Sequence, residues 1–257
     1  MSVVLTAWHV IDKFIAANRR GLADGTCHLA VVFETSDPAP GGHCLGGPLP
    51  VESVRHLVGT DLAVLRLFDL LSGSDLIIPA RLAGIGFGPP PTQDYCYGFG
   101  YPKLSGGPIA LEGDRAVVDF VRQLNVTGGR VWDVFPTGRD AESRLPRWCP
   151  YFDCDAPAPG GMSGGPVMTD KAGLCGLIST AYDPFDKGDR WASNISLLAP
   201  LLGCPVLCAD EAGRTVEATI HELALDGHIE VRGSLPSRPG VPEVETHRFP
   251  VPRPLGR

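Results

Sequence analysis

The chain has 257 residues, enough for one large domain or two small ones with a substantial core. Its 44% hydrophobic and 20% charged residues are ordinary for a soluble globular protein, and its net charge of −7 argues against nucleic acid or an anionic membrane as the main partner. No apolar run reaches the roughly 18 residues of a spanning helix, and the start lacks the features of a signal peptide. We therefore expect a cytoplasmic protein bound neither to nucleic acid nor to a membrane.

Short strand-like runs dominate the chain. Its 32 glycines and 25 prolines favour many turns over long helices. Runs of β-branched, aromatic or alternating residues predict strands at 3–7, 28–34, 62–67, 94–99, 116–124, 130–135, 165–169 and 174–180. Helical pieces are expected at 9–20 and 193–203. Many short strands between glycine and proline turns indicate an all-β barrel or sandwich.

The last part of the chain differs from the rest. Residues 215–233 alternate apolar and polar side chains around Asp226-Gly227, a pair that favours a type I′ turn, so we expect an additional β-hairpin. Residues 234–257 are proline-rich and almost free of core residues, which predicts a disordered tail or linker. The hairpin and the tail suggest a module that joins a fused domain or docks on a partner protein.

The eight cysteines admit three interpretations. An even number is compatible with four disulfides, but a chain without an export signal meets reducing conditions. Cys149 and Cys154, with Cys204 and Cys208, could form a four-thiolate zinc site, although their spacings are wider than the usual C-x2-C pattern. We favour buried free thiols, and we expect no bound metal and no cofactor.

The segment GMSGGPV at 161–167 contains a candidate nucleophile, Ser163. GMSGG matches the G-x-S-x-G pattern of the α/β-hydrolases, in which the serine opens a helix. Residues downstream could supply the Ser, Asp, His order of that pattern: Asp189, Asp210, His221 and His228. Gly165 and Pro166 nevertheless disfavour a helix after the serine, and a strand-like run follows, which argues against this pattern.

The same segment fits the pattern G-x-S-G-G-P, and two further segments precede it. LTAWHV at 5–10 contains T-A-x-H, and TDLAVLRL at 60–67 contains D-L-A-V-L-R-L. With these three segments the chain resembles the chymotrypsin-like (trypsin-like) serine proteases, and the intracellular, bacterial and HtrA-like branches more closely than the secreted enzymes. The resemblance implies His9 as general base, Asp61 as the residue that orients it, and Ser163 as nucleophile. The order His, Asp, Ser is that of this family and not of the α/β-hydrolases.

These residue types suit acyl transfer. A serine hydroxyl becomes a good nucleophile when an imidazole accepts its proton, and a buried carboxylate holds that imidazole in the required tautomer. By the same resemblance, the backbone N–H groups of Gly161 and Ser163 form the oxyanion hole.

The resemblance also indicates substrate-binding residues. It places Ser179 beside the triad, Ala181 in the wall of the primary specificity pocket and Pro157 at the pocket floor. Because the floor position is not an acid, we expect a small or medium apolar substrate side chain rather than Lys or Arg. Asp155, two residues earlier, leaves this expectation open.

Three positions depart from the family pattern. Met162 stands where secreted members have an Asp that pairs with a newly freed N-terminus, so activation by that ion pair is excluded. Val10 replaces a disulfide cysteine, which agrees with a reducing compartment. Only five residues precede Thr6, so we expect the first barrel to lack its opening strand unless the start lies upstream or another segment fills the gap.

The resemblance implies two six-stranded antiparallel Greek-key β-barrels and a short C-terminal helix. A proline run at 86–93 separates the strands into two groups, so that His9 and Asp61 fall in the first barrel and Ser163 in the second. The expected units are an N-terminal barrel at 1–88, a C-terminal barrel at 89–208, an additional hairpin at 209–233 and the tail at 234–257.

We expect a serine endopeptidase that hydrolyses peptide bonds of protein or peptide substrates through an acyl-enzyme. The alternative is a protease-fold binding or regulatory module whose barrel no longer supports catalysis. The complete set of His9, Asp61 and Ser163 favours the enzyme, because binding modules of this kind often lose a member of the triad.

Overall fold

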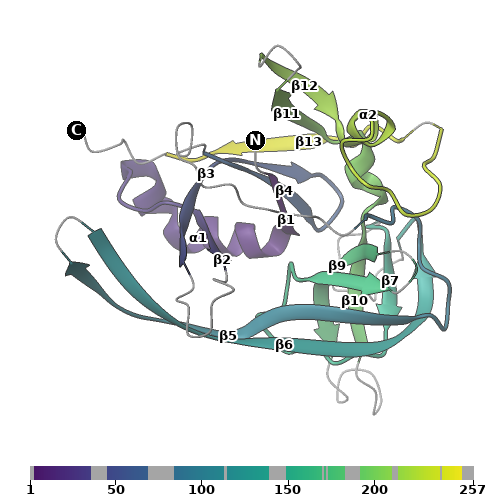
Figure 1. Ribbon diagram of the computed structural model, residues 1–257, viewed down its shortest axis with the longest axis horizontal. Coiled ribbons are helices and arrows are strands. Elements are labelled where there is room, and N and C mark those ends of the chain that lie inside the picture. Colours follow the sequence, from purple (N-terminus) through teal and green to yellow (C-terminus); the bar gives the residue numbers. More distant parts are fainter. Residues whose placement is uncertain are drawn as a thin grey trace.

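The computed structural model describes residues 3–35, 45–68, 84–112, 115–138, 149–169, 171, 173–182, 192–209, 214–237 and 239–250. Its strands form two main units, an open sheet and a closed barrel, with a small two-stranded sheet beside them (Figure 1). The predicted all-β fold with two antiparallel units is thus confirmed: the second unit is the expected six-stranded barrel, whereas the first is an open sheet of five strands and not a closed barrel of six.

The first unit is an antiparallel sheet of five strands that carries one long helix. Its elements are β1 (Val3–Ala7), α1 (Trp8–Asp24), β2 (Ala30–Thr35), β3 (Leu45–Leu57), β4 (Leu62–Leu67) and β13 (Val244–Arg248), in the strand order β1-β4-β3-β13 with β2 also paired to β3. β4 is almost wholly apolar because both of its faces are covered. Ala63 and Leu65 pack with Ile11 of α1, whereas Leu62 and Val64 belong to a cluster shared with the second unit.

The second unit is a closed six-stranded barrel. Its strands are β5 (Tyr95–Glu112), β6 (Arg115–Phe135), β7 (Tyr151–Cys154), β8 (Pro166–Thr169), β9 (Gly173–Tyr182) and β10 (Ala192–Leu197), in the order β10-β7-β6-β5-β8-β9. Phe152, Val131 and Ile178 fill its interior. The two strands predicted at 116–124 and 130–135 are parts of the single long strand β6.

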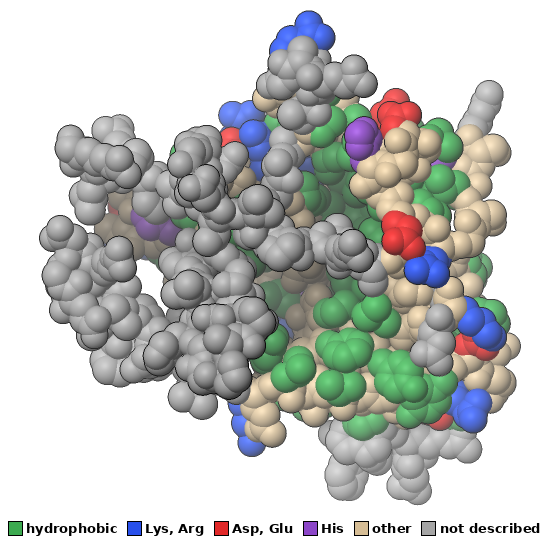
Figure 2. Space-filling model, viewed as in Figure 1, with side chains coloured by type: hydrophobic (Ala, Val, Ile, Leu, Met, Phe, Trp, Pro, Cys, Tyr) green, Lys and Arg blue, Asp and Glu red, His purple; other side chains and the backbone are tan. Residues whose placement is uncertain are grey.

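Large hydrophobic side chains are exposed on the outside of this barrel. Figure 2 shows them gathered over β5 and β6, on the face turned toward the viewer. The exposed members on these two strands are Tyr95, Tyr97, Tyr101, Leu124, Val126 and Trp132. They alternate along each strand with buried residues such as Cys96 and Val131, as expected when one face of a sheet lines a barrel interior.

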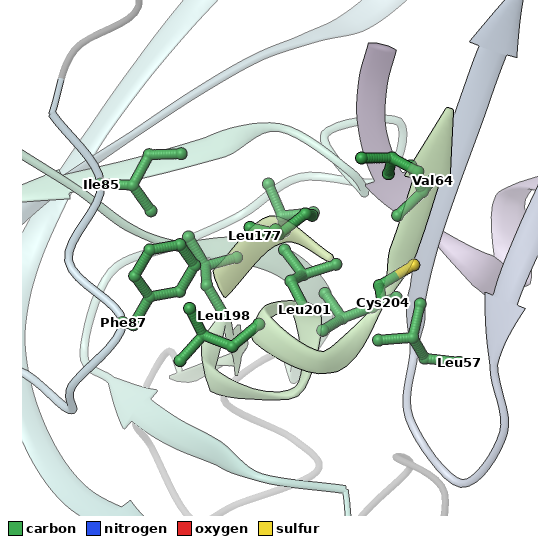
Figure 3. Packing of buried hydrophobic residues seen from close by; sticks show 12 residues of the cluster. Leu57, Val64, Ile85, Phe87, Leu177, Leu198, Leu201 and Cys204 are labelled. Atoms are coloured by element: carbon green, nitrogen blue, oxygen red, sulfur yellow. The ribbon is translucent and has the colours of Figure 1, made fainter. Parts of the chain in front are cut away.

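An apolar cluster joins the two units (Figure 3). Leu57 and Val64 come from the first sheet, and Leu177 comes from β9 of the barrel. The connection between the units supplies Ile85 and Phe87, and a 3-10 helix, η1 (Ala199–Gly203), adds Leu201 and Leu202. Because this cluster contains residues next to Asp61 and close to Ser179, its packing fixes the relative position of the predicted site residues.

The helix predicted at 193–203 is wrong in its first half. Residues 192–197 form β10, which pairs with β7 on one side and β9 on the other, and the helical part is only η1. All six residues of β10 are buried, so barrel closure outweighs the local preference for a helix. No helix in the described part of the chain is both long and apolar enough to cross a membrane.

The predicted hairpin at 215–233 is also wrong. β12 (Thr215–Thr219) pairs instead with β11 (Pro205–Ala209), and a short helix, α2 (Ile220–Leu225), follows it. Thr219 and Glu222 form a capping box that starts α2, and Asp226 ends that helix rather than making a hairpin turn. The T-x-x-E pattern of residues 219–222 was the sequence signal for this helix, and it agrees with the expected short C-terminal helix.

The described part of the segment 234–257 does not match the predicted disordered tail, and residues 251–257 of this prediction lie outside the described residues. β13 pairs antiparallel with β3, from Val244 opposite Leu57 to Arg248 opposite Ser53, and thereby adds a strand to the first sheet. Phe249, directly after β13, is 8% exposed and packs in the core beneath α1. A remote partner strand therefore orders a segment whose composition alone indicates disorder.

The described cysteines are free thiols, and all of them are buried except Cys27 and Cys208, which are half-buried. Cys149, Cys154 and Cys204 belong to three separate clusters, so the possible four-thiolate zinc site is not assembled. Cys154 instead faces Cys96, with 3.1 Å between their sulfurs inside the barrel. Burial raises the pKa of the Cys149 and Cys204 thiols to about 11 and that of Cys175 to about 12.

We predict that Phe249→Ala lowers the free energy of unfolding by about 3 kcal/mol, because it removes a buried aromatic side chain from the core below α1. Urea unfolding monitored by circular dichroism measures this change. Val241→Ala is the matched control from the same segment; Val241 is 90% exposed, so its truncation leaves stability unchanged within about 0.5 kcal/mol. Equal stabilities of the two variants would contradict the packing of this segment.

We also predict that stability falls as pH rises above 9. A thiol whose pKa is raised in the folded state keeps its proton there, while the unfolded chain ionises from its ordinary pKa of about 9. The contribution of Cys175 is therefore complete below pH 9 and is lost as pH approaches 12. Urea unfolding from pH 8 to 11 measures the slope.

Comparison with variants isolates the thiol from other groups that titrate in this range. Cys175→Val makes the slope of stability against pH shallower than that of wild type. An identical slope in wild type and Cys175→Val would show that the buried thiol is not responsible.

Candidate active site

His9 and Asp61 are brought together at one end of β1 and β4. Ala7, the last residue of β1, pairs with Leu62, the first residue of β4. The chain then turns into α1, and the backbone N–H of Trp8 donates to the carbonyl of Asp61 at 3.0 Å. His9, in the first turn of α1, therefore lies opposite Asp61.

The Asp61 carboxylate accepts hydrogen bonds from three groups. The backbone N–H and the ring Nδ1 of His9 each lie 2.9 Å from one of its oxygens, and the Ser179 hydroxyl donates to the oxygen that also accepts from Nδ1. Asp61 is 3% exposed, so these donors replace the water it has lost. α1 has no side-chain cap at its own N-cap residue, and Asp61, just before β4, accepts a hydrogen bond from a backbone N–H of its first turn.

This contact determines the tautomer of His9. A carboxylate can only accept, so Nδ1 carries the proton, and Nε2 of the neutral ring is left as an acceptor. The side chain of His9 is 28% exposed, which leaves the ring accessible at the surface of the site.

Ser163 lies in a tight loop, residues 160–165, which packs against the chain just before His9. Gly164 has a φ of +82°, and its N–H donates to the carbonyl of Ile178 at 2.7 Å. A Cβ on Gly164 would collide with the Thr6 side chain and lie 3.1 Å from the Ala7 nitrogen. Only glycine fits both the backbone conformation and this close approach.

The Ser163 hydroxyl donates to the backbone carbonyl of Ser179 at 3.1 Å. Within the described residues, no hydrogen bond joins Ser163 to His9. Ser179 thus contacts two of the predicted residues, its hydroxyl bonding Asp61 and its carbonyl bonding Ser163.

The two predicted oxyanion donors are unoccupied by protein acceptors. Within the part of the chain that the structure describes, the backbone N–H groups of Gly161 and Ser163 make no hydrogen bond to protein, whereas that of Met162 donates to the Pro159 carbonyl at 3.2 Å. Gly161 has a φ of +96°, where a Cβ would meet the carbonyl of Pro102 at 2.9 Å. Met162 is 1% exposed and anchors the loop in the barrel core.

The residues expected in the specificity pocket are spread over different environments. Pro157 is exposed, and Ala181 is half-buried at the edge of the barrel core. The Asp155 carboxylate accepts a hydrogen bond from the backbone N–H of Arg130, and the Asp155 N–H donates to the Arg130 carbonyl at 3.1 Å. Both the side chain and the backbone of Asp155 are therefore bonded to the backbone of β6.

A polar row beside Ser179 was missed by sequence reasoning. The Thr180 hydroxyl donates to the side-chain oxygen of Asn194 at 2.8 Å, and the Asn194 amide donates in turn to Asp153. The three residues occupy paired positions on β9, β10 and β7. Neither β7 nor β10 was predicted as a strand, so no signal placed these residues near one another.

Comparison with known proteins agrees with this fold. Residues 2–177 match the family described as "Trypsin-like peptidase domain". In the search of curated proteins, no sequence matches.

Solved structures similar to this chain include three proteases. The Rv3671c protease from M. tuberculosis, in its active form, is 16% identical over 59% of this chain and 55% of its own, with a TM-score of 0.39. The MamO protease domain from Magnetospirillum magneticum is 16% identical over 77% of this chain and 79% of its own, with a TM-score of 0.45. Deg5 is 19% identical over 70% of this chain and 69% of its own, with a TM-score of 0.43. This chain thus spans little more than half of the Rv3671c chain.

The family match runs from β1 into β9 and includes His9, Asp61 and Ser163. It covers well over half of the chain and agrees with the paired β units. The chain therefore belongs to the trypsin-like peptidase domain family.

Proposed function

We propose that this protein is a serine endopeptidase in which Ser163 is the nucleophile, His9 the general base and Asp61 the residue that orients His9. The observation that carries the proposal is the buried Asp61 carboxylate, which holds Nδ1 of His9 at 2.9 Å and so leaves Nε2 free to accept a proton. Membership of the peptidase family supports protein or peptide substrates.

In the proposed reaction, His9 Nε2 takes the hydroxyl proton of Ser163 as the oxygen attacks the carbonyl carbon of the scissile bond. Asp61 stabilises the imidazolium that forms. The N–H groups of Gly161 and Ser163 bind the developing oxyanion. His9 then gives its proton to the leaving amine, and a water molecule activated by His9 hydrolyses the acyl-enzyme.

The hydrogen bond from Ser163 to the Ser179 carbonyl has to be broken before Ser163 can act as nucleophile. To react, the hydroxyl has to exchange that acceptor for Nε2 of His9. This bond also favours the second candidate function, a protease-fold binding or regulatory module in which Ser163 stays bonded to Ser179. The two functions differ in whether Ser163 can be acylated.

A fluorophosphonate probe tests the proposal on the full chain. We predict covalent labelling of wild type that is abolished in Ser163→Ala and slowed by about 10³- to 10⁴-fold in Asp61→Asn, because the amide no longer holds His9 in the required tautomer. Labelling is followed by mass spectrometry and by its rate. Ser234→Ala, at an exposed serine far from the site in sequence, is the control and labels like wild type.

Absence of labelling in folded wild-type protein would reject the enzyme and favour the binding module. Labelling that persists in Ser163→Ala would reject Ser163 as the nucleophile.

We further propose that the enzyme prefers a small or medium apolar side chain before the scissile bond. Pro157 offers no negative charge at the proposed pocket floor, and Asp155 is bonded to the backbone of β6. We predict that activated ester substrates with Ala or Val at this position react at least 10-fold faster than those with Lys or Arg, as judged by kcat/KM. A preference for Lys or Arg would overturn this assignment.

A further inference from the structure

A small cavity lies outside the predicted catalytic region, between the first sheet and the β11–β12 pair. Its volume is about 150 Å³. Its lining comes from β1, β3, β4, β11 and β13: Val3, Glu52, Ser53, Arg55, Val64, Arg66, Val206, Leu207, Thr246 and Arg248. Figure 1 shows β11 and β12 standing beside β13, on the side of the sheet away from α1.

Strand register brings the charged residues of this cavity together. Val3, Arg66, Ser53 and Arg248 are direct partners in one row across β1, β4, β3 and β13. Arg55 lies in an adjacent row of the same face, opposite Thr246. Three guanidinium groups from three strands therefore line one small space.

The acidic neighbours do not neutralise all three arginines. Arg66 Nε pairs with Glu52 at 3.2 Å, and Arg55 pairs with Glu217 at 2.8 Å and donates to the Pro205 carbonyl. Arg248 has no ion pair or hydrogen bond with any described residue. The cavity therefore keeps one unpaired positive charge in a chain whose net charge is −7.

Several donors at the cavity are unused. The guanidinium of Arg248 makes no ion pair in the described part of the chain. The hydroxyls of Ser53 and Thr246, which flank the arginines, likewise have no hydrogen-bond partner among the described residues. Forked guanidinium donors with adjacent hydroxyls match the oxygens of a tetrahedral oxyanion.

We propose that this cavity binds a phosphate group. A cavity of about 150 Å³ has room for a phosphate that carries a short organic substituent. The apolar side chains of Val3, Val64 and Val206 provide a surface against which that substituent packs. The ligand is free phosphate or a small phosphomonoester, which share the group that the arginines recognise. When bound, it bridges β1, which leads to His9, and β4, which follows Asp61.

Isothermal titration of the full chain with inorganic phosphate, and separately with O-phosphoserine, tests the site. We expect saturable binding with a Kd of about 1 mM or below, weakened by added salt because the contacts are between charges. Arg248→Ala weakens binding by at least 10-fold. Arg248 is exposed and unpaired, so its removal breaks no ion pair of the fold, which circular dichroism verifies.

Matched variants separate the site from general charge. Arg20→Ala removes an exposed arginine of α1 that does not line the cavity, and it leaves the Kd unchanged. Ser53→Ala, a small change within the cavity, weakens binding without changing the net charge. A 10-fold preference for O-phosphoserine assigns the ligand to a phosphomonoester, and equal affinities assign it to free phosphate.

The proposal is overturned if neither ligand binds saturably up to about 20 mM, or if Arg248→Ala and Ser53→Ala bind both ligands as wild type does. Binding is measured without any reaction. This result is therefore independent of whether Ser163 is catalytic.

Discussion

The contacts between the two β units at the candidate active site depend on one buried carboxylate, that of Asp61. Asp61 is withdrawn from water at the junction of the two units, and a buried carboxylate is tolerated only where donors surround it. Two of its donors come from His9 in the first unit and one comes from Ser179 in the second. Losing a partner from a buried charge of this kind costs about 3–5 kcal/mol. The contacts that orient His9 therefore also join the two β units.

Apolar packing places these polar groups. Leu62, next to Asp61, and Leu177, two residues before Ser179, belong to the cluster that joins the units (Figure 3). Hydrophobic burial has no directional preference of its own. Because successive side chains of a strand point to opposite faces, however, burying one residue also fixes the direction of its neighbours. With Leu62 and Leu177 held in that cluster, the side chains of Asp61 and Ser179 meet at its margin.

Features set by short segments could be predicted, and those set by remote partners could not. The composition of residues 3–7 and 62–67 is enough to predict that each forms a strand. His9, Asp61 and Ser163 could be identified because each lies in a short sequence motif. β10 and β13 instead depend on strands far away in the chain, which local composition does not report. Asp226-Gly227 predicts a hairpin turn, but the capping box that begins seven residues earlier starts α2, and Asp226 ends that helix instead. The Ser163 bond to the Ser179 carbonyl involves a backbone group, for which a sequence holds no signal.

The pairing of β13 with β3 has a consequence for the order in which the protein forms. During synthesis β1, β3 and β4 leave the ribosome long before β13, so residues 53–57 of β3 form an unpaired edge of the nascent sheet until β13 has been made. Contacts between such distant segments are slow to form. The sheet that holds His9 and Asp61 is therefore completed only after the barrel that carries Ser163 has emerged.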